Sequence, residues 1–196
     1  MSFYRETVLV VASVALLTAC SATLSPTIPT PTGGAAFHDT LAASKATSGM
    51  PDPIGHGTLS VFAIKVADVE VTNGDPAELV MAAFRKTLEA HGYRVVEPAA
   101  APDSPVFEVR IRRFEFKNYT WFAPIVFNWG DIELDLRLTE PSGRELWKES
   151  YTGEGWKFAY SFSRVVNTAL EEVLGKAVDD FASSPFREAC CAKAAP

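Results

Sequence analysis

Three carboxylates stand at alternate positions of one short segment: Asp131, Glu133 and Asp135. In an extended strand such residues project from one face, and grouped carboxylates can perform acid–base chemistry or bind a divalent cation. Isoleucine and leucine fill the positions between them, which is the ordinary pattern of a strand with one face in water. Arg110 and Arg112, on a preceding segment, would pair with these carboxylates across a sheet. We therefore favour a structural role over a catalytic one.

The other residue types that perform chemistry are few and scattered. His38 and His56 lie in a tract without any secondary-structure pattern, and His91 falls at the end of an expected helix. A zinc site or a Ser or Cys triad is difficult to assemble from such positions. The sequence contains no glycine-rich phosphate loop, no dinucleotide fingerprint and no Gly-x-Ser-x-Gly motif. We expect no enzyme activity, no metal and no cofactor.

Charge and cysteine content narrow the class of partner. The net charge is -6 and the basic residues are scattered, so we expect no nucleic-acid partner. Cys190 and Cys191 are neighbours, and a disulfide between adjacent residues would be strained because their Cα atoms are about 3.8 Å apart. The pair would either cross-link to another chain or stay reduced in a disordered tail over residues 185–196.

A folded domain is expected over residues 58–184. Residues 59–71 begin with an apolar run that predicts a central strand. Asp75 as N-cap, Pro76 at the first helical position and Glu78 in a capping box predict a helix that ends at Gly92.

The remaining segments complete the domain. The expected elements are strands at residues 93–97, 106–117, 131–138 and 145–152 and a helix at residues 161–182. The apolar phase of residues 106–117 slips by one position at Arg112 and Arg113, which predicts a β-bulge. The order β-α-β-β-β-β-α predicts an α+β domain with a largely antiparallel sheet and two helices packed on one face.

One segment, residues 119–129, is rich in aromatic residues and almost without charge. Its large aromatic side chains are Tyr119, Trp121, Phe122, Phe127 and Trp129. If the segment is the end of a hairpin, these side chains form a surface for a partner or a lipid. If it folds over the core, they are buried. Residues 153–160 are expected to line the same surface.

The N-terminus has the layout of an export signal. One basic residue precedes an apolar run of about 10 residues, which as a helix rises only about 15 Å and is too short to span a bilayer. Its end, Leu17-Thr18-Ala19-Cys20, resembles the lipobox of bacterial lipoproteins. The resemblance implies that residues 1–19 are cleaved and that Cys20 carries the lipid that anchors the chain. With Ser21 next, it also implies the outer membrane, facing the periplasm.

Residues 20–57 are dominated by Ser, Thr, Pro, Ala and Gly, a composition that cannot bury enough apolar surface to fold. We expect a lipidated Cys20 followed by a flexible tether.

Two further motifs carry a resemblance to small envelope lipoproteins of the YajG type and, more loosely, to PqiC-like transport-accessory lipoproteins. They are His91-Gly92-Tyr93-Arg94-Val95 and Val165-Val166-Asn167-Thr168-Ala169-Leu170. The resemblance implies no established activity. Our leading hypothesis is an accessory lipoprotein that binds an envelope transport or assembly component. The alternative is a carrier of a lipid or other apolar ligand, held between sheet and helices.

Overall fold

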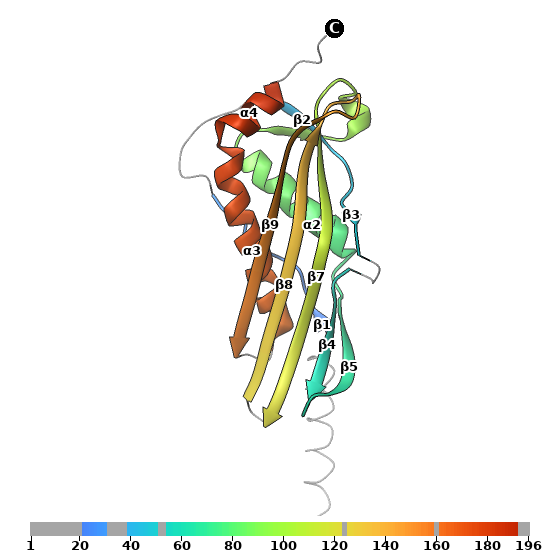
Figure 1. Ribbon diagram of the computed structural model, residues 1–196, viewed down its shortest axis with the longest axis vertical. Helices are drawn as coiled ribbons and strands as arrows, with labels where there is room; N and C mark the ends of the chain where they lie inside the picture. The colour runs from blue at the N-terminus through green and yellow to red at the C-terminus, as the bar shows by residue number, and fades with distance from the viewer. Residues whose placement is uncertain (1–20, 31–38, 51–53, 123–124, 159–160, 192–196) are drawn as a thin grey trace, which may run out of the picture.

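Three long antiparallel strands form the largest part of the sheet of this protein, shown as a computed structural model in Figure 1. They are β7 (Val106–Phe122), β8 (Ile125–Thr139) and β9 (Glu145–Phe158). The structure describes residues 21–30, 39–50, 54–122, 125–158 and 161–191, with the backbone alone at 120–122, 125–126 and 191. The N-terminal signal, Cys20 and His38 therefore lie outside the described residues.

Shorter strands extend the sheet beyond β7. Its free edge pairs in turn with β2 (Thr40–Ala43), β3 (Thr47–Ser48) and β4 (His56–Val61), all in parallel. The outer strands are β6 (Arg94–Val96) beside β2, β5 (Ile64–Val71) beside β4, and β1 (Ser21–Ala22) beside β5. The long pairs are antiparallel as expected, but the sheet as a whole is mixed.

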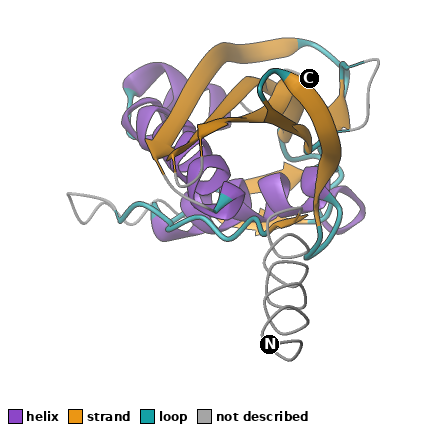
Figure 2. Ribbon diagram, turned by 90° about the horizontal axis from the view of Figure 1, so that it is seen from below, coloured by secondary structure: helices purple, strands orange, loops and turns teal. Residues whose placement is uncertain are grey.

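The helices lie on one face of this curled sheet, which we name the inner face (Figure 2). They are α2 (Pro76–Ala90), α3 (Phe162–Phe181) and α4 (Ser184–Cys191), with a short 3-10 helix, η1, at Pro98–Ala100. Phe84 of α2, Phe107 of β7 and Phe181 of α3 meet in the core with ring centroids 5.9 to 6.4 Å apart. The α+β class and the two main helices on one face are confirmed.

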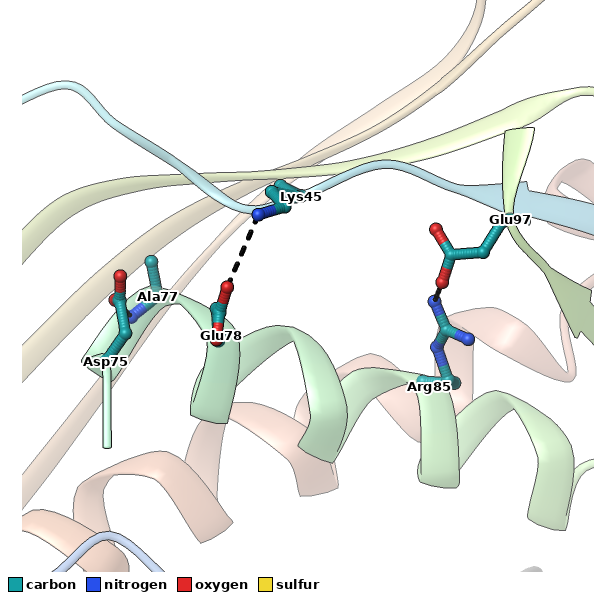
Figure 3. A network of polar contacts seen from close by, with 6 residues as sticks. All are labelled: Lys45, Asp75, Ala77, Glu78, Arg85 and Glu97. Carbon is teal, nitrogen blue, oxygen red and sulfur yellow. Dashed lines mark hydrogen bonds and ion pairs between the residues drawn. The ribbon is translucent and has the colours of Figure 1, made fainter. Parts of the chain in front are cut away.

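Local signals placed α2 correctly. Asp75 Oδ1 accepts a hydrogen bond of 2.8 Å from the Ala77 N–H, and Gly92 adopts φ 89° directly after the helix. His91 is buried at the C-cap, where its Nδ1 lies 2.8 Å from the Thr87 carbonyl oxygen. Glu78 was expected to close a capping box with Asp75, but its carboxylate forms an ion pair with Lys45 instead (Figure 3).

The strand predictions were right for the bulge and wrong for the first strand. The β7–β8 register shifts between Ile111 and Arg113, which confirms a bulge at Arg112. Residues 59–71 are not one strand but the hairpin of β4 and β5, with its turn at Phe62 and Ala63. Neither turn residue is Gly, Asn or Pro, so the sequence carried no turn signal there.

The predicted tether is wrong for the parts of residues 21–57 that the structure describes. The N–H groups of Thr23, Ser25 and Thr27 donate to side chains one helical turn apart on α3. The acceptors are Ser163 Oγ at 2.9 Å, Asn167 Oδ1 at 2.7 Å and Glu171 Oε1 at 2.8 Å. The donors are two extended residues apart, about 6.6 Å, and the acceptors are four helical residues apart, about 6 Å. Each donor therefore lies opposite its own acceptor. The segment lies fixed along the helix.

The predicted disordered tail is wrong as far as Cys191. Phe186 of α4 is fully buried and Cys190 is nearly so, against the top of the core. The described part of the folded domain therefore begins at Ser21 and ends at Cys191, outside the expected bounds of residues 58 and 184.

Asn167 gives a test of the fixed N-terminal segment, because it accepts from Ser25 N–H and donates to the Thr23 carbonyl at 3.1 Å. We expect Asn167→Ala to lower the free energy of unfolding by about 1 kcal/mol and to speed amide hydrogen exchange at Ser25. Arg164→Ala, an exposed change on the same helix, is the control. Unchanged exchange at Ser25 would show that the segment is held by something else.

Candidate functional site: an aromatic surface on three strands

A ladder of aromatic residues crosses β7, β8 and β9 on the face opposite the helices, which we name the outer face. The register places Tyr119 beside Phe127 and Phe127 beside Phe158, and two residues along it places Trp129 beside Trp156. Side chains at alternate positions of paired strands share a face, so these five form one patch. We name it the outer aromatic surface.

The rings of this surface touch one another. Phe127 stacks on Trp156 with centroids 6.5 Å apart and meets Phe158 edge-on at 5.5 Å. Lys117 Nζ lies 5.9 Å from the ring centroid of Trp129, within range of a cation–π interaction. These contacts hold the rings in a defined arrangement without covering them.

Four of the five side chains of this surface are exposed to solvent, and the fifth, Phe127, is half-buried among them. Phe158 is 70% exposed and Trp156 61%, with Tyr119 and Trp129 near 40%. Single exposed apolar residues are ordinary, but five aromatic residues in one patch on neighbouring strands are not. Such a patch is typical of a surface that another molecule covers.

Sequence reasoning found part of this surface. Tyr119, Phe127 and Trp129 lie in it, at the end of a hairpin rather than folded over the core. The side chains of Trp121 and Phe122 lie outside the described residues. Trp156 and Phe158 confirm that residues 153–158 contribute, although β9 continues six residues beyond its expected end; residues 159–160 lie outside the described residues.

A row of carboxylates bounds the surface. Glu115, Asp131 and Glu154 are side by side in the register of β7, β8 and β9, one outward position beyond Lys117, Trp129 and Trp156. Asp131 Oδ2 accepts from Arg113 Nη1 at 2.8 Å. An apolar centre with a charged rim resembles the layout of a protein–protein interface.

Two of the three carboxylates of β8, Asp131 and Asp135, form ion pairs with arginines of β7. Asp135 is fully buried, and its oxygens accept from Arg112 Nε and Ser150 Oγ, each at 2.7 Å. Burial alone would raise the pKa of Asp135, but these two hydrogen bonds and the Arg112 charge outweigh it and hold the pKa below its ordinary value. Within the described ranges, no cluster of three or more His, Cys, Asp or Glu residues is arranged to hold a metal ion.

The Arg112–Asp135 pair predicts a pH-dependent effect. We expect Arg112→Ala to lower the free energy of unfolding by about 2 kcal/mol at pH 7, since a buried carboxylate then loses its cation. A lowered pKa stabilises the fold above the unfolded-state value of about 3.9 and ceases to do so as pH falls through the folded value. The difference between variant and wild type, measured by urea denaturation, should therefore shrink at pH 3. A difference that is equal at both pH values would contradict this.

Glycines on the inner face seat α3 directly behind the outer aromatic surface. A Cβ atom at Gly153 would lie 2.0 Å from the Ala169 carbonyl oxygen, and one at Gly155 would lie 2.2 Å from the Val165 carbonyl oxygen. Only glycine permits a helix backbone to approach a strand this closely. The surface is thus backed by a packed helix, and we expect it to be rigid.

Side chains of α3 also close part of the β9 edge. Lys176 Nζ donates to the Thr152 carbonyl at 2.7 Å, and Glu172 Oε2 accepts from the Glu154 N–H at 2.9 Å. The hydrogen bond from Lys176, then that from the Glu154 amide, lowers the pKa of Glu172. Occupied backbone groups cannot pair with a strand of another molecule, so this stretch is protected against edge-to-edge association.

The alternative of an apolar ligand held between sheet and helices has less support. The residues of the outer aromatic surface lie on the face opposite the helices. The groove between residues 43–46 and α2 has a volume of about 380 Å³ and an apolar floor of Ala43, Met81 and Ala82. Two ion pairs bridge it: Lys45–Glu78 at 3.4 Å and Arg85–Glu97 at 2.6 Å (Figure 3). No aromatic residue lines this groove.

Among the residues that the structure describes, no helix has the length and apolarity needed to cross a membrane.

No family model matches the sequence, and no curated protein is similar to it. Solved structures do have a similar fold. XCC0632 of Xanthomonas campestris, a DUF330 protein, superposes with a TM-score of 0.50 at 14% identity, over 80% of this chain and 89% of that one.

Two bacterial lipoproteins are among the other similar structures. GNA1162 of Neisseria meningitidis gives a TM-score of 0.43 at 13% identity, over 74% of this chain and 99% of its own. A minor lipoprotein of Acinetobacter baumannii gives 0.38 at 9% identity, over 78% and 97%. At these identities the likeness to XCC0632 concerns the fold alone, and membership of the YajG type stays a prediction.

Proposed function

We propose that this protein is a lipid-anchored accessory protein of the bacterial envelope, without enzymatic activity, that binds a protein component of a transport or assembly complex. The outer aromatic surface is the single observation that carries the proposal. Its Trp, Tyr and Phe side chains are residue types enriched at protein interfaces, and Trp and Tyr are the types most often found at binding hot spots.

The setting of the surface also favours a protein partner. The carboxylate row of Glu115, Asp131 and Glu154 gives it a polar rim, and α3 behind it removes the entropy cost of ordering a loose surface on binding. Side chains on a sheet face project out of the plane of the sheet. The surface therefore faces away from the helices, where a neighbouring protein can reach it.

The anchor follows from the lipobox. Acylation of Cys20 would hold the protein to a bilayer almost irreversibly, since each buried methylene contributes about 0.8 kcal/mol. Ser21 supports placement at the outer membrane with the domain in the periplasm. Incorporation of labelled palmitate, and its loss in Cys20→Ala, tests this part of the proposal.

The double variant Trp156→Ala, Phe158→Ala tests partner binding. We expect co-purification of envelope proteins from cross-linked cells to fall more than tenfold, as hot-spot aromatics cost about 2 kcal/mol or more each when truncated. Both side chains are more than half exposed, so the urea midpoint should not change. Lys148→Ala, an exposed change on the same face of β9, is the matched control. Equal recovery of partners with the double variant would refute the proposed role of this surface.

A further inference from the structure

The chain enters the fold at once after Cys20. Ser21 and Ala22 form β1, in parallel register with Glu70 and Val71 of β5, and the Thr72 N–H donates to the Ala22 carbonyl at 2.9 Å. One peptide bond separates Cys20 from Ser21, so their Cα atoms are about 3.8 Å apart. A lipid on Cys20 would therefore be attached to the body of the domain beside β5, not to a long flexible arm.

The same strand leads to an exposed apolar tip. The β4–β5 hairpin ends in Phe62, Ile64 and Val66, which are 62%, 69% and 54% exposed. Ile64 is six residues from Glu70, the register partner of Ser21, so the tip lies roughly 20 Å along the strand from the attachment point. In Figure 1 this hairpin ends at the same end of the molecule as the β7–β8 hairpin.

The turn itself is unusual. Phe62 has φ 50° and Ala63 has φ 63°, a left-handed conformation that favours glycine or asparagine and that strains residues with a larger side chain. Backbone strain of this kind costs about 1 kcal/mol or more at each residue and concentrates at functional positions. Here it presents a phenylalanine at the extreme end of the hairpin.

We propose that the β4–β5 tip inserts into the bilayer that holds the Cys20 lipid, as a second, shallow membrane contact. This inference rests on the lipid anchoring in the proposed function. The anchor brings the neighbouring strand to the bilayer surface. Burial of the apolar tip there is favourable by about 25 cal/mol for each Å² of apolar surface removed from water.

The charges of the hairpin set the depth of insertion. Lys65 Nζ pairs with Asp68 Oδ1 at 2.6 Å, and His56 Nε2 lies 3.7 Å from Glu70 Oε1 further from the tip. These groups belong at the level of the headgroups, so Phe62 and Ile64 are the side chains that pass below it. Two contacts, lipid and tip, fix the tilt of the domain and hold the outer aromatic surface beside the membrane.

Photo-crosslinking to lipid tests the inference. The full-length acylated protein, carrying a benzophenone amino acid at Phe62, is reconstituted into vesicles of phosphatidylethanolamine and phosphatidylglycerol that contain radiolabelled phosphatidylethanolamine. The same substitution at Lys148, which is exposed near the start of β9 and far from the hairpin tip, is the control. We expect at least tenfold more labelled protein from position 62 than from position 148. Equal labelling at the two positions, or none, would overturn the inference.

Flotation of the same samples separates the two proposals. Protein that floats with the vesicles but gives no lipid adduct at position 62 retains its anchor and lacks the tip contact. Protein that does not float has no working lipid anchor, and both proposals then fail. A protein adduct at position 62 in cells, in place of a lipid adduct, would assign the tip to a protein partner and would also overturn the inference.

Discussion

Gly153→Ala is expected to lower the free energy of unfolding by about 3 kcal/mol or more. The new Cβ would stand 2.0 Å from the Ala169 carbonyl oxygen and 2.8 Å from Val173 Cγ2. Overpacking usually costs about 1 to 3 kcal/mol, and relief here requires α3 to move as a whole because the first contact is with its backbone. Urea denaturation followed by circular dichroism would measure the loss.

Gly175→Ala is the control, because Gly175 lies in α3, the helix that Gly153 contacts, and a Cβ there meets nothing within 4 Å. Alanine has the higher helix propensity, so this variant should be stabilised by up to about 1 kcal/mol. Equal effects of the two substitutions would show that α3 does not rest on the glycines of β9.

Phe186→Ala is expected to cost about 4 kcal/mol, the usual range for a buried phenylalanine. Its ring is fully buried and lies 4.8 Å from Trp147 and 4.9 Å from Phe181, centroid to centroid. Thermal and urea unfolding would measure the loss, with the exposed change Glu188→Ala as control. A loss below about 1 kcal/mol would show that residues 185–191 do not pack against the core and form a disordered tail instead.

The elements with strong local signals were predicted well. The N-cap of α2 at Asp75, its end at Gly92 and the apolar stripe of α3 all depend on residues within a few positions of one another. The bulge at Arg112 was visible because a slip of one residue exchanges the two faces of a strand. Such features can be predicted because the residues that determine them are close together in the sequence.

The N-terminal segment could not be predicted from its composition. Its partners are Ser163, Asn167 and Glu171, about 140 residues away in the chain, and they hold backbone groups that any residue possesses. Strands β1, β2 and β3 have two to four residues each, too few to show a period. The same weakness hid α4, whose one fully buried ring belongs to Phe186.

The outer aromatic surface was also predicted only in part, because β9 continues past its expected end. Aromatic composition marked residues 119–129, but the last strand was expected to end at residue 152, before the two glycines that seat α3, Gly153 and Gly155. Trp156 and Phe158 were therefore expected near the surface without a place in the sheet. The register of β8 and β9 puts them directly beside Trp129 and Phe127.

The fixed N-terminal segment changes what an anchor at Cys20 would do. A flexible tether would let the domain sample many orientations, whereas a chain that joins β1 at Ser21 allows few. A rigid surface held at one height and orientation raises the effective concentration for a neighbour in the same membrane. The proposed role therefore depends as much on the attachment as on the aromatic residues.

Photo-crosslinking in cells from position 156, compared with position 148 on the same face of β9, tests the proposed function most directly. We predict a discrete protein adduct from position 156, absent from position 148 and from cells that lack the envelope component identified in the adduct by mass spectrometry. The same adducts from both positions, or none from position 156 while the protein is folded and acylated, would contradict the proposed function.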